Sequence, residues 1–263
     1  MSNILPGPMV RLDGDLDVAI REDDESGLIR NISINERVFG IRLADTERGR
    51  SEASLLISRM YATRGYQVTS PLVYGPNRIT LTAACDGVTM GTVTLGIDSP
   101  MGILADEIFK GEIDTFRTRG GRVCEITKFA VDPQMRSKHA LAALFHTLFI
   151  YARYLYGCTD MFIEVNPRHR RFYENMLGFR QLGELRENPR VHAPAYLLRL
   201  CLNEAAKHIE LHGDTSDNPG KDRSLYPYFF SKKEEEGIAH RLFNITWAPE
   251  QKAQQHVAQR RYG

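Results

Sequence analysis

The sequence lacks the features that mark several common classes of protein. Its 263 residues carry 34 basic and 33 acidic side chains, a formal net charge of +1, so no overall charge favours nucleic acid or a membrane surface as a partner. The only cysteines are Cys85, Cys124, Cys158 and Cys201, with no C-x-x-C pair, and three of them lie in or beside apolar runs. Packed, reduced thiols are therefore expected rather than disulfides or zinc ligands.

Long hydrophobic runs and the common nucleotide or hydrolase motifs are missing as well. The most apolar stretch, residues 140–156, contains His146 and Arg153 and is shorter than the roughly 20 residues of a membrane span. No basic-then-apolar export signal opens the chain, so we expect a cytoplasmic protein without stable membrane insertion. There is no P-loop, dinucleotide fingerprint or G-x-S-x-G elbow. His208 and His212 have helical spacing but no third ligand, so no metal site is predicted.

Composition divides the chain into three parts. Residues 1–30 are acidic and irregular, and we expect a flexible arm. Residues 31–203 carry the strand and helix patterns and are predicted to form one α+β domain. After a polar loop, residues 204–263 contain the aromatic cluster 226–230 and later Phe243 and Trp247, which predicts an extension packed on the domain.

Local patterns predict the elements of the domain. Strands are expected over 37–43, 78–85, 89–95, 122–132, 159–165, 179–185 and 191–202, with a hairpin turn at Asp86-Gly87. Helices are expected over 46–59, 103–118, 138–156 and 168–177. Asp45 or Thr46 is predicted to cap the first helix and Ser137 the third. The last strand is expected to close the sheet, its Pro194 suiting an edge or a bulge.

The stretch 122–179 carries the most specific signal. An apolar strand containing Glu125 precedes a long apolar helix, a second strand, and a helix with Tyr173 just before Gly178-Phe179. This order resembles the GCN5-related N-acetyltransferase (GNAT) superfamily. The resemblance implies an α+β GNAT-type acyltransferase fold, a mixed central sheet flanked by helices, with a C-terminal extension here. It also implies an acyl donor held between splayed parallel strands, with its phosphates at the next helix N-terminus.

Further strings resemble narrower families. The segment Gln134-Met-Arg-Ser-Lys-His139 has none of the glycines of the coenzyme A loop, which makes coenzyme A the less expected donor. Glu125-Ile-Thr-Lys-Phe-Ala-Val131 resembles the acyl-homoserine-lactone synthases, which use acyl carrier protein. Arg59-Met-Tyr61, Asn166-Pro-Arg-His169 and 189–195 resemble the long-chain N-acyl amino acid synthases of the FeeM type. The resemblance implies that an amino acid's amine directly attacks an acyl carrier protein thioester. This donor carries 4′-phosphopantetheine, and no cofactor would be bound permanently.

The resemblance and the residues together assign candidate roles. Buried in a strand, Glu125 is either the general base or a structural partner of Arg59. By strand alternation, Glu164 lies on the same face of the sheet as Glu125. It is a second candidate for the general base or for a group that positions the amine. Tyr173 matches the tyrosine that protonates the departing thiolate, and a buried structural tyrosine is the alternative.

Backbone and basic groups complete the predicted site. A backbone N–H of Phe129, Ala130 or Val131 is expected to stabilise the oxyanion. Asn166 is expected to bind the pantetheine amides or to act only as a turn residue. Basic residues expected around the donor entrance suit an acidic acyl carrier protein: Arg122, Lys128, Arg136, Lys138, Arg168 and Arg171.

Three alternatives remain open at this point. A homoserine-lactone synthase is less favoured because Thr94-Leu95 stands where an Arg-Leu pair is expected. A coenzyme-A-dependent N-acetyltransferase is less favoured by the glycine-free loop. The third is a non-catalytic module that binds acyl carrier protein or lipid. The sequence does not identify the acceptor amino acid, the acyl chain length or the oligomeric state.

Overall fold

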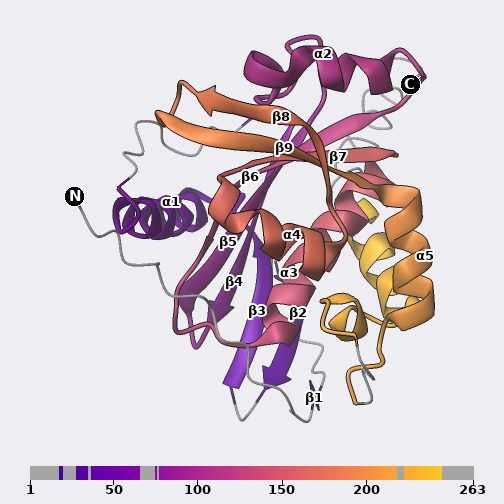
Figure 1. Cartoon of the computed structure of the whole chain (residues 1–263). Helices are drawn as coiled ribbons and strands as arrows, with labels where there is room; N and C mark the ends of the chain where they lie inside the picture. The colour runs from indigo at the N-terminus through magenta and orange to yellow at the C-terminus, as the bar shows by residue number, and fades with distance from the viewer. Residues whose placement is uncertain are drawn as a thin grey trace, which may run out of the picture.

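A mixed nine-stranded sheet organises the computed structural model, which describes residues 18–19, 28–34, 37–65, 75, 77–217 and 222–244. The strand order is β1-β2-β3-β4-β5-β6-β7-β9-β8 (Figure 1). The strands are β1 (Val18–Ala19), β2 (Leu28–Ile34), β3 (Arg37–Leu43), β4 (Arg78–Cys85), β5 (Val88–Ile97), β6 (Val123–Val131), β7 (Asp160–Val165), β8 (Arg180–Asn188) and β9 (Ala193–Cys201). All described pairs are antiparallel except β6 with β7. The predicted α+β architecture is therefore confirmed.

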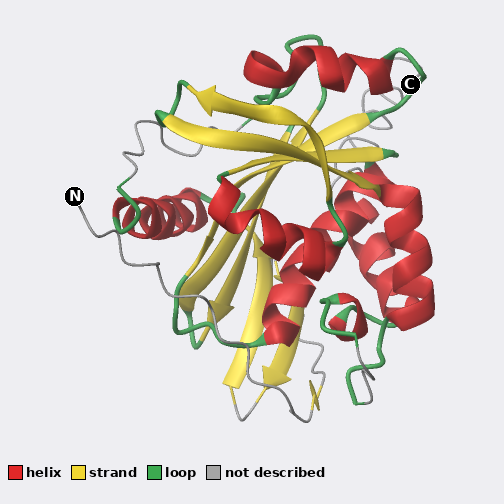
Figure 2. Cartoon of the chain, viewed as in Figure 1, coloured by secondary structure: helices red, strands yellow, loops and turns green. Residues whose placement is uncertain are grey.

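Helices cover both faces of this sheet (Figure 2). The helices are α1 (Glu47–Ala62), α2 (Asp106–Arg117), α3 (Lys138–Ile150), α4 (Arg170–Leu177) and α5 (Leu202–His212). A π-helical turn, Tyr151–Leu155, continues α3, and a 3-10 turn, Pro167–His169, leads into α4. Because β6 and β7 are parallel, the chain must cross over between them, and α3 is that crossover.

Local chemistry sets the element ends where the sequence predicted them. The Thr46 side chain accepts a hydrogen bond from the Gly49 N–H at 3.1 Å and caps α1. Ser137 caps α3 in the same way, at 3.1 Å from the Ala140 N–H. The turn between β4 and β5 has positive φ at both Asp86 (50°) and Gly87 (78°), as a type I′ hairpin turn requires.

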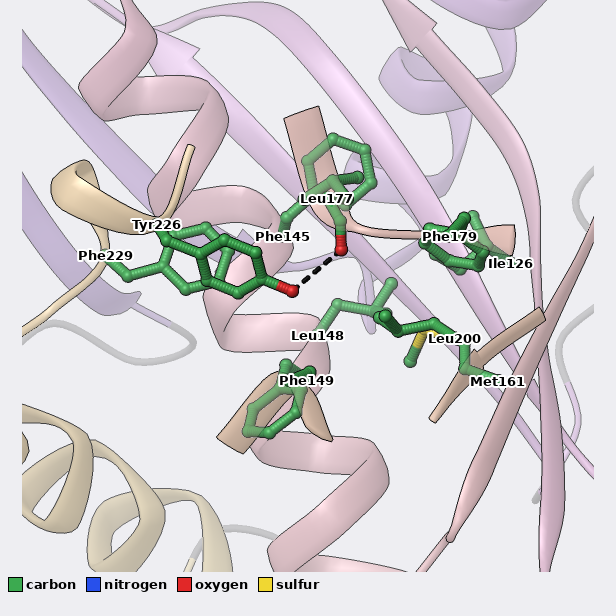
Figure 3. Close-up of a pocket in the computed structure, with 11 residues that line it drawn as sticks. Ile126, Phe145, Leu148, Phe149, Met161, Leu177, Phe179, Leu200, Tyr226 and Phe229 are labelled. Atoms are coloured by element: carbon green, nitrogen blue, oxygen red, sulfur yellow. Dashed lines mark hydrogen bonds between the residues drawn. The ribbon is translucent and has the colours of Figure 1, made fainter. Parts of the chain in front are cut away.

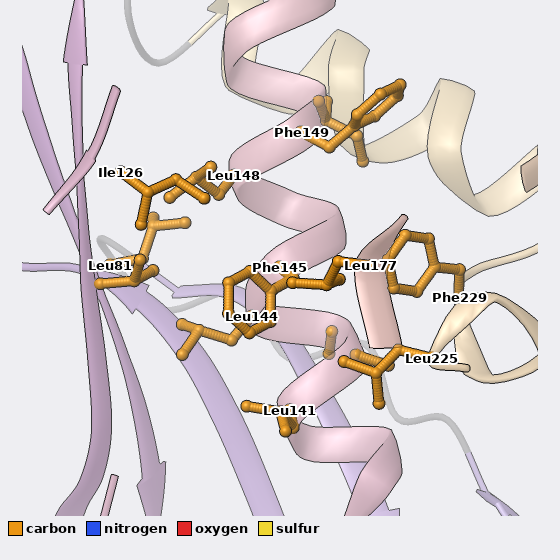
Figure 4. Close-up of a cluster of buried hydrophobic side chains, with 14 of the residues drawn as sticks. Leu81, Ile126, Leu141, Leu144, Phe145, Leu148, Phe149, Leu177, Leu225 and Phe229 are labelled. Carbon is orange, nitrogen blue, oxygen red and sulfur yellow. The ribbon is translucent and has the colours of Figure 1, made fainter. Parts of the chain in front are cut away.

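The two sheet faces have different cores. On one face, the long α3 is buried along almost its whole length and contacts β2, β3, β4 and β5. Leu81 of β4 and Ile126 of β6 belong to the same core (Figure 4). On the other face, α2 packs on Val123 and Phe162, while α1 packs Leu56 and Ile57 toward Ala130. The α1 and α2 clusters are separate, so a strip of sheet lies between them without an apolar cover. That strip proves to be polar.

Two predictions about the sheet need correction. The last strand does not close the sheet, because β9 lies between β7 and β8 and leaves β8 at the edge. Pro194 is tolerated there because the pairing of β9 with β7 ends at Tyr196, so only β8 lies beside Pro194. The predicted arm over 1–30 lies mostly outside the described residues, but Val18–Ala19 and the start of β2 are paired strands rather than irregular chain.

The segment after β9 packs on the α3 face. The Tyr226 hydroxyl donates to the Leu177 carbonyl at 2.7 Å, and the Phe230 N–H donates to Nδ1 of the buried His146 at 2.9 Å. Residues 232–244 are helical, with Ile238 and Leu242 fully buried. Trp247, named above as an anchor, lies outside the described residues.

Candidate active site

The two parallel strands separate part-way along their length. The pairing of β6 with β7 runs from Val123↔Asp160 to Ile126↔Ile163 and then stops, although β6 continues to Val131. At the same place β6 holds one residue more than β5, since the pairs on either side are Thr94↔Thr127 and Thr92↔Ala130. The extra residue forms a β-bulge, with Lys128 at φ 51°. A bulge bends its strand, and residues 127–131 are no longer paired with β7, which leaves a gap in the sheet between the two strands.

The oxyanion candidates lie in this unpaired part of β6. Phe129, Ala130 and Val131 have pairing partners on the β5 side at most and none in β7. Their edge toward β7 is therefore available to a ligand's backbone-like amides. At the end of β7, the Asn166 side chain accepts a hydrogen bond from the Arg168 N–H at 3.3 Å, as a turn residue does. Its role toward pantetheine stays a prediction.

Aromatic rings line the gap on its α3 side. The ring centroid of Phe129 lies 5.0 Å from that of Phe145 and 6.4 Å from those of Phe172 and Tyr173. Tyr173 projects from α4 and is 7% exposed, and burial raises the pKa of its phenol. The hydroxyl therefore keeps its proton at neutral pH. The candidate proton donor thus lies beside the unpaired strand, as a role toward the leaving thiolate requires.

Glu125 is held by backbone donors rather than by Arg59. Its two carboxylate oxygens accept hydrogen bonds from the Leu104 N–H at 2.8 Å and the Ala105 N–H at 3.1 Å. Burial raises the pKa of Glu125, and these two N–H bonds oppose that rise. Leu104 and Ala105 lead into α2, so the carboxylate lies at the positive end of this helix. Glu125 is thus an anchor for the start of α2.

Arg59 pairs with a different acid from the one expected. Its guanidinium donates to the Asp132 carboxylate at 2.5 Å. Asp132 follows the end of β6, where α1 crosses, whereas Glu125 lies seven residues earlier in the chain and next to the start of α2. Arg59 therefore forms a structural ion pair, but with Asp132. The Asp132 carboxylate also accepts from the Gln134 N–H at 2.8 Å and so shapes the loop before α3.

Glu164 is the carboxylate with an open hydrogen-bonding position. It shares Glu125's face of the sheet, as strand alternation predicted, because Ile163 and Val165 belong to the α3-side core. One oxygen is ion-paired with Arg190, while Oε1 is buried and has no hydrogen-bond partner among the described residues. Burial raises the pKa of Glu164 to about 7, against the opposing attraction of Arg190. A carboxyl group with this pKa is suited to proton transfer near neutral pH.

Sequence reasoning missed Arg190, which positions Glu164. Its guanidinium also contacts the Glu107 carboxylate and donates to the Leu104 carbonyl at 2.9 Å, so it joins the α2 start to β7. Arg190 stands in the segment 189–195, which carried part of the family resemblance but received no role. The partner of a strand carboxylate in a distant loop cannot be found from spacing along the chain.

The basic residues predicted around the donor entrance do not share one surface. Arg136 and Lys138 flank the capping Ser137 at the start of α3, and Arg168 and Arg171 lie at the start of α4. Lys128 is half-buried in the bulge on the sheet floor. Arg122 precedes β6, at the end of the strand opposite the gap, so the prediction that it borders the donor entrance is wrong. A strand of this length places its two ends about 25 Å apart.

A small apolar cavity lies on the α3 side, against the last paired rung of β6 (Figure 3). Its volume is about 20 Å³, room for roughly one water molecule. Ile126 and Met161 from the sheet form one wall, and Phe145 connects it to the aromatic rings of the gap. Tyr226, Phe229 and Ala205 from the segment after β9 form the opposite side.

Among the described residues, no group of three or more His, Cys, Asp and Glu side chains is arranged to hold a metal ion. None of the described helices is both long and apolar enough to cross a membrane.

Comparisons with known proteins place the chain among acyltransferases. Residues 52–201 match the family described as N-acyl amino acid synthase FeeM. The solved structure of FeeM, an N-acyl amino acid synthase from uncultured soil microbes, is 27% identical with a TM-score of 0.59, covering 64% of this chain and 93% of that one. The structure of Arabidopsis thaliana NAA60 is 20% identical with a TM-score of 0.46, covering 62% of this chain and 98% of that one. The coenzyme-A-dependent acyl-homoserine lactone synthase MesI is 16% identical with a TM-score of 0.44, covering 64% of this chain and 90% of that one. No curated protein is significantly similar.

A mixed sheet opened between two parallel strands, with a tyrosine on the following helix, defines an N-acyltransferase of the GNAT fold. The match to residues 52–201 covers more than half of the sequence. The chain therefore belongs to the FeeM family of N-acyl amino acid synthases.

Replacing Glu125 with Gln should destabilise the fold. The Gln amide would place an NH₂ against one of the two N–H donors, leaving a buried donor unsatisfied at a cost of about 1–3 kcal/mol. Urea unfolding measures this loss, and Glu184→Gln on the exposed part of β8 serves as the matched control, with a change below about 0.5 kcal/mol. Unchanged stability together with lost activity would instead make Glu125 a catalytic base.

Proposed function

We propose that this enzyme transfers a long-chain acyl group from acyl carrier protein to the α-amine of an amino acid, by direct attack of the amine. The observation that carries the proposal is the gap between β6 and β7, which has different chemistry on its two sides. Glu164, with an open carboxylate oxygen, lies on the α1/α2 side, and Tyr173 and apolar side chains lie on the α3 side. An amine would approach from the first side and the thioester from the gap itself.

The reaction balances with these groups alone and needs no bound cofactor. The amine nitrogen attacks the thioester carbon while Glu164 accepts the amine proton. A backbone N–H of 129–131, at the bulge, stabilises the developing oxyanion. The carbon–sulfur bond then breaks, and Tyr173 gives its proton to the departing thiolate of the pantetheine arm. Exchange with solvent removes the proton from Glu164 and returns one to Tyr173 before the next turnover. Burial keeps Tyr173 protonated until that step.

The loop before α3 favours a carrier protein over coenzyme A as the donor. Its shape is fixed by side chains: Met135 is buried in the core, and Asp132 binds the Gln134 N–H. Ser137 already caps the helix. A loop filled in this way offers little room to wrap a nucleotide's pyrophosphate. Arg136 in this loop, and Arg168 and Arg171 at the start of α4, are exposed and suit the acidic surface of acyl carrier protein.

The apolar cavity on the α3 side favours the proposal that the transferred acyl chain is long. It lies against Ile126, the last β6 residue paired with β7, so a chain entering the gap would reach it past Phe129 and Phe145. Its volume of about 20 Å³ holds no such chain without movement of its lining. Met161 and the leucines of the lining are unbranched or flexible enough to change rotamer.

The pH dependence of the reaction should report Glu164. A base must be ionised, so kcat/KM for the amine should increase through pH 7 as Glu164 loses its proton. The substrate amine titrates at higher pH, so log kcat/KM should rise with a slope near 2 below pH 7 and near 1 above it. Glu164→Gln should lower the rate about 100-fold or more and leave a slope near 1 throughout. A wild-type slope of 1 below pH 7 would contradict this role.

Donor choice should depend on basic residues near the gap. Arg136→Glu with Lys138→Glu should raise the KM for acyl carrier protein thioester about tenfold, because charges that oriented the acidic partner now repel it. The KM for a short acyl-pantetheine thioester should not change. Arg122→Glu, at the far end of β6, is the matched control and should alter neither. Equal effects on both donors, or faster transfer from acyl coenzyme A than from the carrier protein, would refute carrier docking.

A further inference from the structure

A row of polar side chains crosses the sheet in the strip between α1 and α2. Thr80 pairs with Thr94 across β4 and β5, and Thr94 pairs with Thr127 across β5 and β6. Thr127 directly follows Ile126, and Glu164 directly follows Ile163, the last pair of β6 and β7. These two side chains therefore face each other where the strands begin to separate. Thr80, Thr94, Thr127 and Glu164 are called the polar row below.

The polar row is satisfied at one end and unsatisfied at the other. Thr80 and Thr94 join their hydroxyls at 2.8 Å. Thr127 Oγ1 and Glu164 Oε1 are both buried and have no hydrogen-bond partner among the described residues. Buried polar atoms are almost always paired, because an unpaired one costs about 1–3 kcal/mol. Two such atoms on the same face of neighbouring strands, both able to accept, suit a ligand that supplies N–H donors.

A neighbouring row adds positive charge. Arg78 pairs with Gly96, and Gly96 pairs with Glu125, so all three lie in one row on this face. Gly96 has no side chain, and a Cβ there would lie 2.9 Å from Glu125 Cγ, so the Glu125 side chain occupies the space above this glycine. Arg78 acts electrostatically on both Glu125 and Lys128, and burial together with Arg78 lowers the pKa of Lys128. Lys128 thus adjoins Thr127 at the open end of the polar row, and Arg78 is near enough to act on Lys128 electrostatically.

Arg78 is better suited than Arg190 to bind an added carboxylate. Arg190 is already occupied by Glu107, Glu164 and the Leu104 carbonyl. Within the described part of the chain, no carboxylate is ion-paired with Arg78. Residues two apart on a strand are separated by about 7 Å, so Arg78 lies one step from Thr80 of the polar row. Its electrostatic effects on Glu125 and Lys128 show that its charge also acts on β6, the strand that carries Thr127.

We propose that Arg78, with Lys128, binds the α-carboxylate of the acceptor amino acid while Thr127 and Glu164 hold its amine at the separating strands. This rests on the proposed function and adds the group that makes the acceptor an amino acid rather than a simple amine. The positive pair and the open carboxylate oxygen match the two ends of an α-amino acid. The amine is then placed beside the residue that accepts its proton, next to the thioester in the gap.

Acceptor discrimination by the full-length chain tests this assignment. Each L-amino acid is compared with its primary amide, which keeps the amine but has no carboxylate charge, at saturating acyl carrier protein thioester. The wild type should prefer the amino acid. Arg78→Met should lower kcat/KM for the best amino acid about 10- to 100-fold and leave that for its amide within twofold. Arg78→Lys should recover part of the preference, and Arg180→Met, on an exposed side chain of β8, should change neither.

Two results would overturn the assignment. Equal losses for amino acid and amide in Arg78→Met would show a structural role, and unchanged preference would place the carboxylate elsewhere. Calorimetric titration of the same amino acid and amide into donor-free protein separates this from the proposed function. Binding that depends on Arg78 without any acyl transfer would uphold the site and refute the function. Absence of Arg78-dependent binding would refute the site even if transfer occurs.

Discussion

The bulge at Lys128 is the constraint on which the rest of the site depends. One residue more in β6 than in β5 bends β6 away from β7 just after Ile126, and no described strand fills the gap. Lys128 takes a left-handed conformation to do this, at a cost of about 1–3 kcal/mol that the flanking pairs must offset. The separation exposes the strand edge at 129–131 and ends the polar row at Thr127 and Glu164. Without the extra residue, both strands would stay paired and neither side of the gap would exist.

The two strand carboxylates have different surroundings and therefore different uses. Glu125 gives both oxygens to backbone donors at the start of α2, which fixes the loop that Arg190 also contacts. Glu164 keeps one oxygen open and has a pKa near 7. Glu125 thereby supports the frame that positions Arg190, and Arg190 positions Glu164. The segment after β9 supports the opposite side, where Tyr226 and Phe229 close the apolar cavity.

Local sequence signals predicted most helices and strands, whereas pairings between residues far apart in the sequence were missed. Alternation and capping residues placed β3, the β4–β5 hairpin and the start of α3 correctly, because Thr46, Ser137 and Asp86-Gly87 act on their own neighbours. The position of β9 between β7 and β8 was missed, because strand order depends on contacts far apart in sequence. The same reason explains Arg59, whose partner is Asp132, and Arg190, which had no predicted role. Spacing shows which residues share a face, but not which charges meet.

The most direct test of this account is mass spectrometry of lipid extracts from cells that express this chain, beside cells that express Glu164→Gln at the same level. N-acyl amino acids with long acyl chains are expected in the first extract, and most of them should be lost in the second. Their masses would also identify the acceptor and the chain length. If folded wild-type protein is present and no new acyl amide appears, the assignment of this gap to long-chain N-acylation of amino acids is wrong.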